Sequence, residues 1–149
     1  MSRWTPDARE RLEKAAYELF VDRGYDQATV ADIAERAGLT ERTFFRHYAD
    51  KREVLFGGSA ALEIELRRAL DDAPPGSPPI EATRIAVVAM SRLLPDRAQA
   101  RKRQEIVVKH LDLQERGLIK RATLTATLAR GLQQRGVPEA AASLAADMG

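Results

Sequence analysis

Apolar side chains recur every three or four residues along most of this chain, which is the spacing of amphipathic helices. Near the N-terminus the spacing predicts a helix that Thr5 caps, with Pro6 at its first position and Gly24 after its end. The apolar stripe of this helix consists of Leu12, Ala15, Ala16, Leu19 and Phe20. We therefore expect an all-α protein that opens with a supporting helix.

A second and shorter helix is predicted over residues 30–37. Thr29 is a good N-cap, and Asp32 places a carboxylate in the first turn, where the helix dipole favours negative charge. Gly38 directly follows the last apolar position and suits the left-handed turn that ends many helices. The chain should therefore reverse direction at Gly38.

A third helix should follow this turn, with Thr40 as its cap. Phe44 and Tyr48 share one face at i, i+4 spacing and should be buried against the preceding helix. The opposite face carries charged, aromatic and hydrogen-bonding groups suited to a major groove: Glu41, Arg42, Phe45, Arg46 and His47. Helices this short need support from others, so the pattern predicts a three-helix, helix-turn-helix head that reads double-stranded DNA.

These residues resemble the N-terminal domain of bacterial TetR-type transcriptional regulators. The motifs that carry the resemblance are 15–20, Gly24-Tyr25, 29–34, 37–39, 43–48 and Lys51. The resemblance implies that Thr29 and Lys51 contact phosphates, and that Glu41, Arg42 and Phe45 contact bases or sugars. The chain departs from the family at Phe45, where tyrosine is frequent, and at Ala31, where some members use a polar base contact. We expect fewer base contacts from the first of the two short helices.

Beyond the head, Asp50 and Glu53 form a further capping pattern, which predicts a helix from Lys51 to about residue 71. Gly57 and Gly58 interrupt it, and each glycine inside a helix costs roughly 1 kcal/mol relative to alanine. The pair indicates either close packing where no side chain fits or a hinge between head and body.

The remaining chain predicts a helical body. Residues 71–79 form a proline-rich loop, and residues 80–94 are apolar nearly all round, as expected of a central helix. Further helices should cover 97–110 and 111–135, and a last one should start after Gly136-Val137-Pro138. Residues 139–148 look too short to bury their alanine-rich face.

By the same resemblance, residues 1–50 would be the DNA-binding domain and residues 51–149 an effector-binding and dimerisation domain. The family pairs its last two helices with a second subunit, so we expect a homodimer whose C-terminal helices are incomplete in this sequence. Periodicity suggests an apolar effector pocket lined by Leu62, Leu66, Met90, Leu94 and Leu128.

Composition narrows the function further. Lys and Arg number 24 against 22 Asp and Glu, and up to Phe56 ten basic residues face eleven acidic ones, so bulk charge does not predict DNA binding. The favourable charge is local, from Thr40 to Arg52. The chain has no cysteine, which excludes disulfides and cysteine-ligated zinc. Without a signal peptide or a long apolar run, we expect a cytoplasmic protein with no membrane partner.

Two other functions compete with this interpretation. An all-helical enzyme is one, but neither histidine has a glutamate three residues before it, and no phosphate-binding glycine loop or HExxH motif occurs. A helical protein-interaction module that retains the head without binding an operator is the other. We predict no cofactor and no catalytic or metal site, and we favour a repressor that a small apolar effector releases from a palindromic operator.

Overall fold

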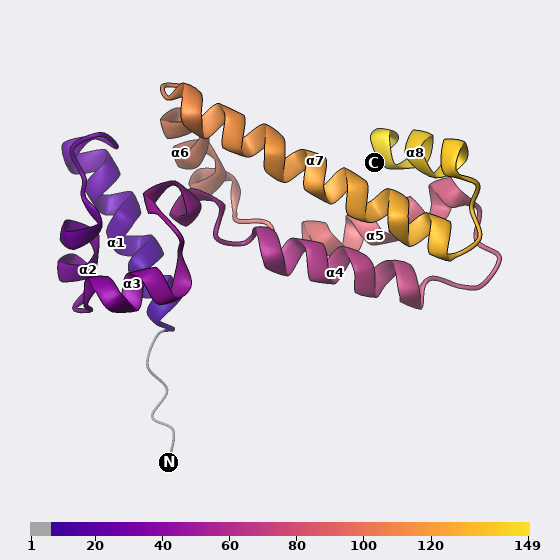
Figure 1. Ribbon diagram of the computed structural model, residues 1–149, viewed down its shortest axis with the longest axis horizontal. Helices are drawn as coiled ribbons and strands as arrows, with labels where there is room; N and C mark the ends of the chain where they lie inside the picture. Colours follow the sequence, from indigo (N-terminus) through magenta and orange to yellow (C-terminus); the bar gives the residue numbers. More distant parts are fainter. Residues whose placement is uncertain (1–6) are drawn as a thin grey trace, which may run out of the picture. The chain divides into compact units, whose positions relative to one another are not determined.

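The computed structural model describes residues 7–149, and this part of the chain contains eight α-helices, one 3-10 helix and no strand (Figure 1). The all-α prediction is confirmed. The chain forms two compact units, of which one holds residues up to Gly57 together with 102–110 and the other holds 58–101 and 111–149. The predicted functional division into residues 1–50 and 51–149 stays a prediction.

The first unit, which we call the head, contains α1 (Ala8–Arg23), α2 (Val30–Ala37), α3 (Glu41–His47) and the 3-10 helix η1 (Lys51–Phe56). The predicted apolar stripe of α1 is buried, as are Ile33, Ala34 and Ala37 of α2. Asp7 caps α1 by accepting a hydrogen bond from the amide of Arg9. The predicted cap at Thr5 and the proline at position 6 lie outside the described residues.

The continuous helix predicted from Lys51 is wrong in its first part. Asp50 does cap the segment, accepting a hydrogen bond from the Glu53 amide at 3.1 Å, but residues 51–56 form 3-10 turns and not an α-helix. Helix α4 (Ser59–Asp72) begins only after the two glycines. The short 3-10 segment buries three successive apolar residues, Val54, Leu55 and Phe56, which a longer amphipathic helix would spread over two faces.

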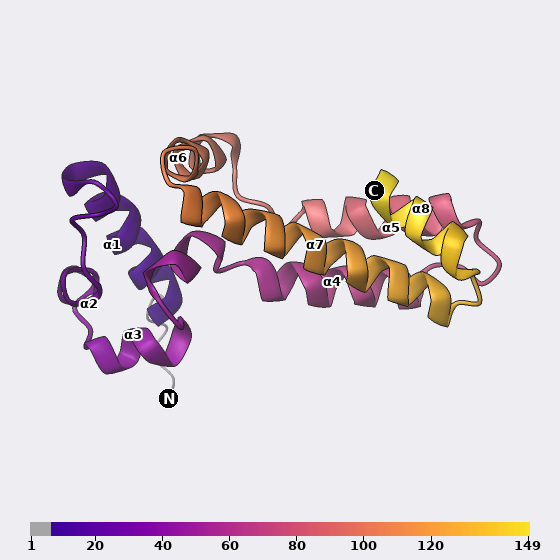
Figure 2. The same cartoon turned by 45° about the horizontal axis from the view of Figure 1, so that its top comes forward.

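The second unit, which we call the body, is built from α4, α5 (Pro79–Ser91), α7 (Leu111–Gln134) and α8 (Glu139–Met148), which pack against one another (Figure 2). Helix α6 (Arg97–Val107) is divided between the two units. The core of the body combines leucines of α4 and α7 with alanines of α4, α5 and α8, and small residues let these helices approach closely. An added methyl group at Gly131 would lie 2.5 Å from a Leu70 methyl carbon.

Two predictions about the body are corrected by the structure. Helix α5 ends at Ser91, before the predicted residue 94, and it is not surrounded by other helices, because Ile80 is 50% and Val88 43% exposed. Helix α8 is long enough to bury its alanine face, since Ala142, Ala145 and Ala146 are at most 5% exposed. Alanine side chains are short, so three of them pack fully within ten residues.

No helix among residues 7–149 combines the length and the apolar character that crossing a bilayer requires.

The glycine pair at the boundary between the units has two different environments. A methyl group added to Gly57 would lie 2.5 Å from the Glu13 carboxylate and 3.0 Å from the Tyr48 ring, so close packing explains this glycine. A methyl group added to Gly58 would meet no atom within 4 Å. The chain passes from head to body between these two residues, so the predicted hinge stays a proposal that concerns Gly58.

Gly58→Ala and Gly57→Ala should therefore change stability in opposite directions. Gly58 has φ −84° and ψ −4°, which alanine adopts readily, so its replacement should stabilise the chain by about 0.4–1 kcal/mol through a less flexible unfolded state. Gly57→Ala should destabilise it by about 1–3 kcal/mol through overpacking. Urea denaturation of both variants measures this difference, and equal midpoints would contradict it.

Candidate nucleic-acid interface

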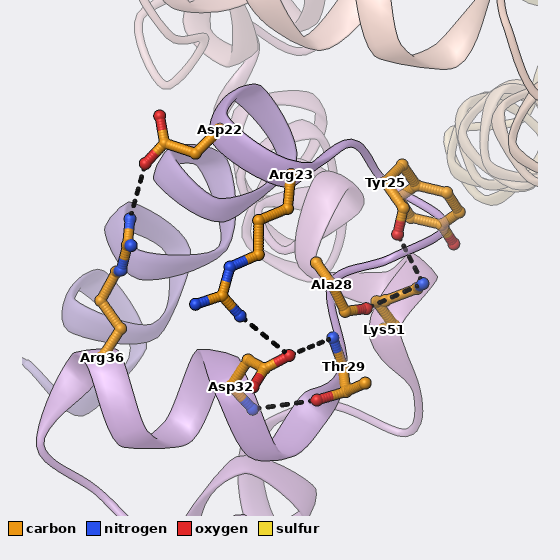
Figure 3. A network of polar contacts seen from close by, with 8 residues as sticks. All are labelled: Asp22, Arg23, Tyr25, Ala28, Thr29, Asp32, Arg36 and Lys51. Atoms are coloured by element: carbon orange, nitrogen blue, oxygen red, sulfur yellow. Dashed lines mark hydrogen bonds and ion pairs between the residues drawn. The ribbon is translucent and has the colours of Figure 1, made fainter.

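The N-terminus of α2 is held by reciprocal hydrogen bonds between Thr29 and Asp32 (Figure 3). The Thr29 hydroxyl accepts from the Asp32 amide at 3.1 Å, and the Thr29 amide donates to the Asp32 carboxylate at 3.2 Å. The Arg23 guanidinium lies 3.3 Å from the same carboxylate. Hydrogen bonds from Thr29, followed by the charge of Arg23, hold the pKa of Asp32 below its usual value.

Acid should loosen this first turn of α2. Because the pKa of Asp32 is depressed in the folded chain, its contribution is fully present above the unfolded value of about 3.9 and is lost as pH falls through the folded value. The protection of the Thr29 amide from hydrogen exchange should fall in that acid range. In Asp32→Ala, the protection of the Thr29 amide should be low at neutral pH and should not change with acid. If protection depends on pH in the same way in this variant and in the wild type, Asp32 does not hold the first turn of α2.

The turn between α2 and α3 is built as the sequence predicted. Gly38 has φ +71°, a left-handed conformation that other residues rarely adopt, and the amide of Leu39 donates to the Ala34 carbonyl at 2.8 Å. A second support, which no local sequence pattern indicated, is the Arg11 guanidinium of α1, which donates to the Ala37 carbonyl at 2.6 Å. This bond satisfies a carbonyl that has no partner within the helix at the end of α2, and it fixes the turn relative to α1.

Helix α3 turns its aromatic residues inward as predicted. Thr40 caps it by accepting from the Thr43 amide at 3.2 Å, and Phe44 and Tyr48 are 0% and 3% exposed. The Tyr48 hydroxyl donates to the Glu13 carboxylate of α1 at 2.7 Å. Burial and this carboxylate raise the pKa of Tyr48, so the hydroxyl remains a donor at neutral pH and holds the end of α3 on α1.

The outer face of α3 is exposed. The Phe45 ring is 53% exposed, and the side chains of Glu41, Arg42 and Arg46 are exposed as well. Neither arginine forms a hydrogen bond or an ion pair with any residue in the described range 7–149. His47, at the end of the helix, is half-buried. Two cations and an aromatic ring on one short helix can therefore contact an anionic ligand without breaking existing interactions.

Other basic groups of the head are already paired within it. The Arg52 guanidinium lies 2.8 Å from the Asp50 carboxylate, and Arg36 of α2 lies 3.1 Å from Asp22 of α1 (Figure 3). Lys51 donates to the backbone carbonyls of Tyr25 and Ala28. Of the four basic side chains between Thr40 and Arg52, Arg42 and Arg46 are therefore the two without a partner within residues 7–149.

The residues predicted to line an effector pocket lie in different environments. Leu66 and Leu128 are buried in the core of the body, and Met90 packs against that core. Leu62 is half-buried, whereas Leu94 lies beyond the end of α5 and is 51% exposed. The structure thus brings together three of the five, and the assignment as a pocket stays a prediction.

Residues 102–110 also belong to the head unit, which no local sequence pattern indicated. The Arg103 guanidinium lies 5.3 Å from the centre of the Phe56 ring, and the His110 ring lies 4.7 Å from that of Tyr25. A carboxylate oxygen of Asp26 is 3.6 Å from His110. His110 is therefore a packed histidine with a polar neighbour.

A family model and several curated relatives match this chain. The family model described as "Bacterial regulatory proteins, tetR family" matches residues 12–56. The HTH-type transcriptional regulator TcmR of Streptomyces glaucescens is 40% identical over 74 residues, which are 50% of this chain and 33% of TcmR. The HTH-type transcriptional activator FasR of Mycolicibacterium smegmatis is 42% identical over 48 residues, which are 32% and 22% of the two chains. The chain spans at most about half the length of its first curated relatives.

Solved structures share the fold. SmeT of Stenotrophomonas maltophilia, in complex with triclosan, aligns with a TM-score of 0.60 and 23% identity over 96% of this chain and 75% of SmeT. The fatty acid degradation regulator FadR of Bacillus halodurans aligns with a TM-score of 0.57 and 19% identity over 98% and 79%. These proteins carry regulator names, in agreement with the prediction that the chain is not an enzyme.

Proposed function

The chain belongs to the tetR family of bacterial regulatory proteins, and on this premise we propose that it is a sequence-specific DNA-binding transcriptional regulator. The observation that carries the proposal is the outer face of α3, where exposed Arg42 and Arg46 have no partner among residues 7–149. Arginine is the side chain that most often reads guanine in the major groove and also binds phosphate bidentately.

The roles of the contact residues follow from their positions. Glu41, Arg42 and Phe45 lie on the exposed face of α3 and would meet base edges or sugars, while Arg46 and His47 at its end would meet the backbone. The hydroxyls of Thr29 and Thr40 cap α2 and α3, so both lie beside exposed helix N-termini that attract phosphate. Lys51 has a different environment, because its ammonium group donates to the backbone carbonyls of Tyr25 and Ala28.

We further propose a homodimer on a palindromic operator and a repressor that a small apolar effector releases. A two-fold symmetric pair would place its α3 helices about one DNA turn, ~34 Å, apart. Exposed apolar side chains on the body, including Leu118 and Ile119 of α7 and Leu144 of α8, support pairing. Effector release requires two states with different operator affinity, since a ligand that favours neither state shifts nothing.

Selection of duplexes from a random-sequence library by the purified chain tests the first proposal. A regulator should enrich a symmetric motif, and the enriched DNA is called the selected duplex below. An interaction module would enrich none. Sedimentation of the complex then tests the dimer, and a screen of small apolar compounds for release of the selected duplex tests the effector. If binding strengthens with an active compound, the protein is not a repressor released by that ligand.

A further inference from the structure

The Lys51 side chain at the start of η1 is held against the turn that precedes α2 (Figure 3). Its ammonium group donates to the Tyr25 carbonyl at 2.7 Å and to the Ala28 carbonyl at 3.0 Å. The same group lies 4.2 Å from the centre of the Tyr25 ring, within the range of a cation–π interaction. Tyr25 itself is 6% exposed, with the His110 ring packed 4.7 Å away.

We infer that Lys51 is a positioning residue: it fixes the turn at residues 25–28, and through it the N-terminus of α2, and this role is separate from any phosphate contact that it makes. The inference rests on the proposed function for what α2 is positioned to do. The two carbonyl bonds use two of the three N–H groups of the ammonium, so they hold the turn in the DNA-free chain whether or not the lysine also meets a phosphate.

The position of the bonded carbonyls explains what Lys51 controls. Ala28 directly precedes Thr29, the cap of α2, whose hydroxyl and amide bond to Asp32. Lys51 directly follows Asp50, the cap of η1, in the segment that leaves α3. One side chain therefore joins the exit of the reading helix to the start of α2, over a sequence separation of 23 to 26 residues.

Hydrogen exchange of the DNA-free chain separates positioning from phosphate binding. In Lys51→Met we expect exchange at the Ala28, Thr29 and Asp32 amides to accelerate by about tenfold, the effect of losing one hydrogen bond to a charged group, with amides in the middle of α1 unchanged. Arg46→Met is the matched control, because it removes one cation from the exposed face of α3 and should leave these amides as they are. Unchanged protection in Lys51→Met would overturn the inference.

The salt dependence of binding to the selected duplex provides the second readout. A lost phosphate contact makes the slope of log affinity against log salt concentration shallower by about 0.9. Lys51→Met should weaken binding by about tenfold more than its change in slope accounts for, whereas the loss of affinity in Arg46→Met should follow from its change in slope. If the change in slope accounts for the whole loss of affinity in Lys51→Met, the lysine acts only as a phosphate ligand and the inference is wrong.

A milder variant covers the case in which Lys51→Met does not fold. Lys51→Gln keeps an N–H donor near the two carbonyls without the charge, so positioning predicts intermediate protection and intermediate affinity. If Lys51 acted only as a phosphate ligand, both variants would lose the salt-dependent part of the affinity for the selected duplex to the same extent. The exchange measurement uses no DNA, so it decides on Lys51 even if the chain selects no duplex, an outcome that would instead refute the proposed function.

Discussion

A chain in which glutamine replaces Arg42 is expected to bind the selected duplex about ten- to a hundredfold more weakly than the wild type, with an unchanged fold. Arg42 is exposed on α3 and has no partner within residues 7–149, so its removal breaks nothing inside the head. A bidentate contact to a base is worth about 1–3 kcal/mol of discrimination, and the loss should be largest for the best sequence. Fluorescence anisotropy titration with the selected and scrambled duplexes measures both quantities.

Arg121→Gln is the control for this variant. Arg121 is an exposed arginine of α7, in the body, and its replacement changes the net charge by the same amount. It should leave the ratio of specific to scrambled affinity unchanged. If Arg42→Gln behaves like Arg121→Gln, then the outer face of α3 does not read DNA and the interaction-module alternative gains support.

Replacing the adjacent residues Phe44 and Phe45 by alanine should give opposite phenotypes. Phe44 is fully buried, so Phe44→Ala should destabilise the head by about 3–5 kcal/mol, a large part of the stability of a small domain. Phe45 is 53% exposed, so Phe45→Ala should change stability by no more than about 0.5 kcal/mol. Urea denaturation followed by NMR signals of α1 to α3 measures the stability of the head directly.

Measurements of DNA binding should also distinguish Phe44→Ala from Phe45→Ala. Phe45→Ala should remain folded and lose affinity for the selected duplex, whereas Phe44→Ala should lose binding only to the extent that the head unfolds. Saturating DNA should raise the apparent stability of Phe44→Ala by mass action. A folded Phe45→Ala with wild-type affinity would remove Phe45 from the proposed interface.

The parts of the head that could be predicted from the sequence depend on neighbours along the chain. Thr29 and Asp32 are three residues apart, and the turn at Gly38 needs only a left-handed backbone conformation, so local rules suffice for both. The burial of Phe44 and Tyr48 follows from i, i+4 spacing on a helix with one supported face. The outer face of α3 is then the side of the helix that remains exposed to solvent.

The parts that escaped prediction depend on partners far away in the sequence. Arg11 bonds to the carbonyl of Ala37, and Lys51 bonds to those of Tyr25 and Ala28, at separations of 23 to 26 residues. No periodicity signals a side chain that binds a distant backbone carbonyl. Counting charged residues therefore overestimated the cations available to a ligand. The count includes Lys51 and Arg52, which both have partners within the head.

In the body, the predictions for α5 and α8 were wrong because the composition and length of a helix were taken as a measure of its burial. The apolar residues of α5 suggested a central helix, yet Ile80 and Val88 are exposed in this chain. Conversely, α8 looked too short to be buried, but alanines allow close helix approach and its inner face packs fully. Which apolar face finds a partner depends on helix packing that a single sequence does not specify.

The ratio of affinities for the selected and a scrambled duplex, measured across a salt series, tests most directly whether α3 reads DNA sequence. Specific regulators typically bind their site about 10³-fold or more tightly than other DNA at physiological salt, and we predict a ratio of this order that survives moderate salt. Affinity for the scrambled duplex should fall steeply with salt, because it depends on counterion release. Equal, weak and salt-erased binding to both duplexes would contradict the proposal that α3 reads DNA sequence.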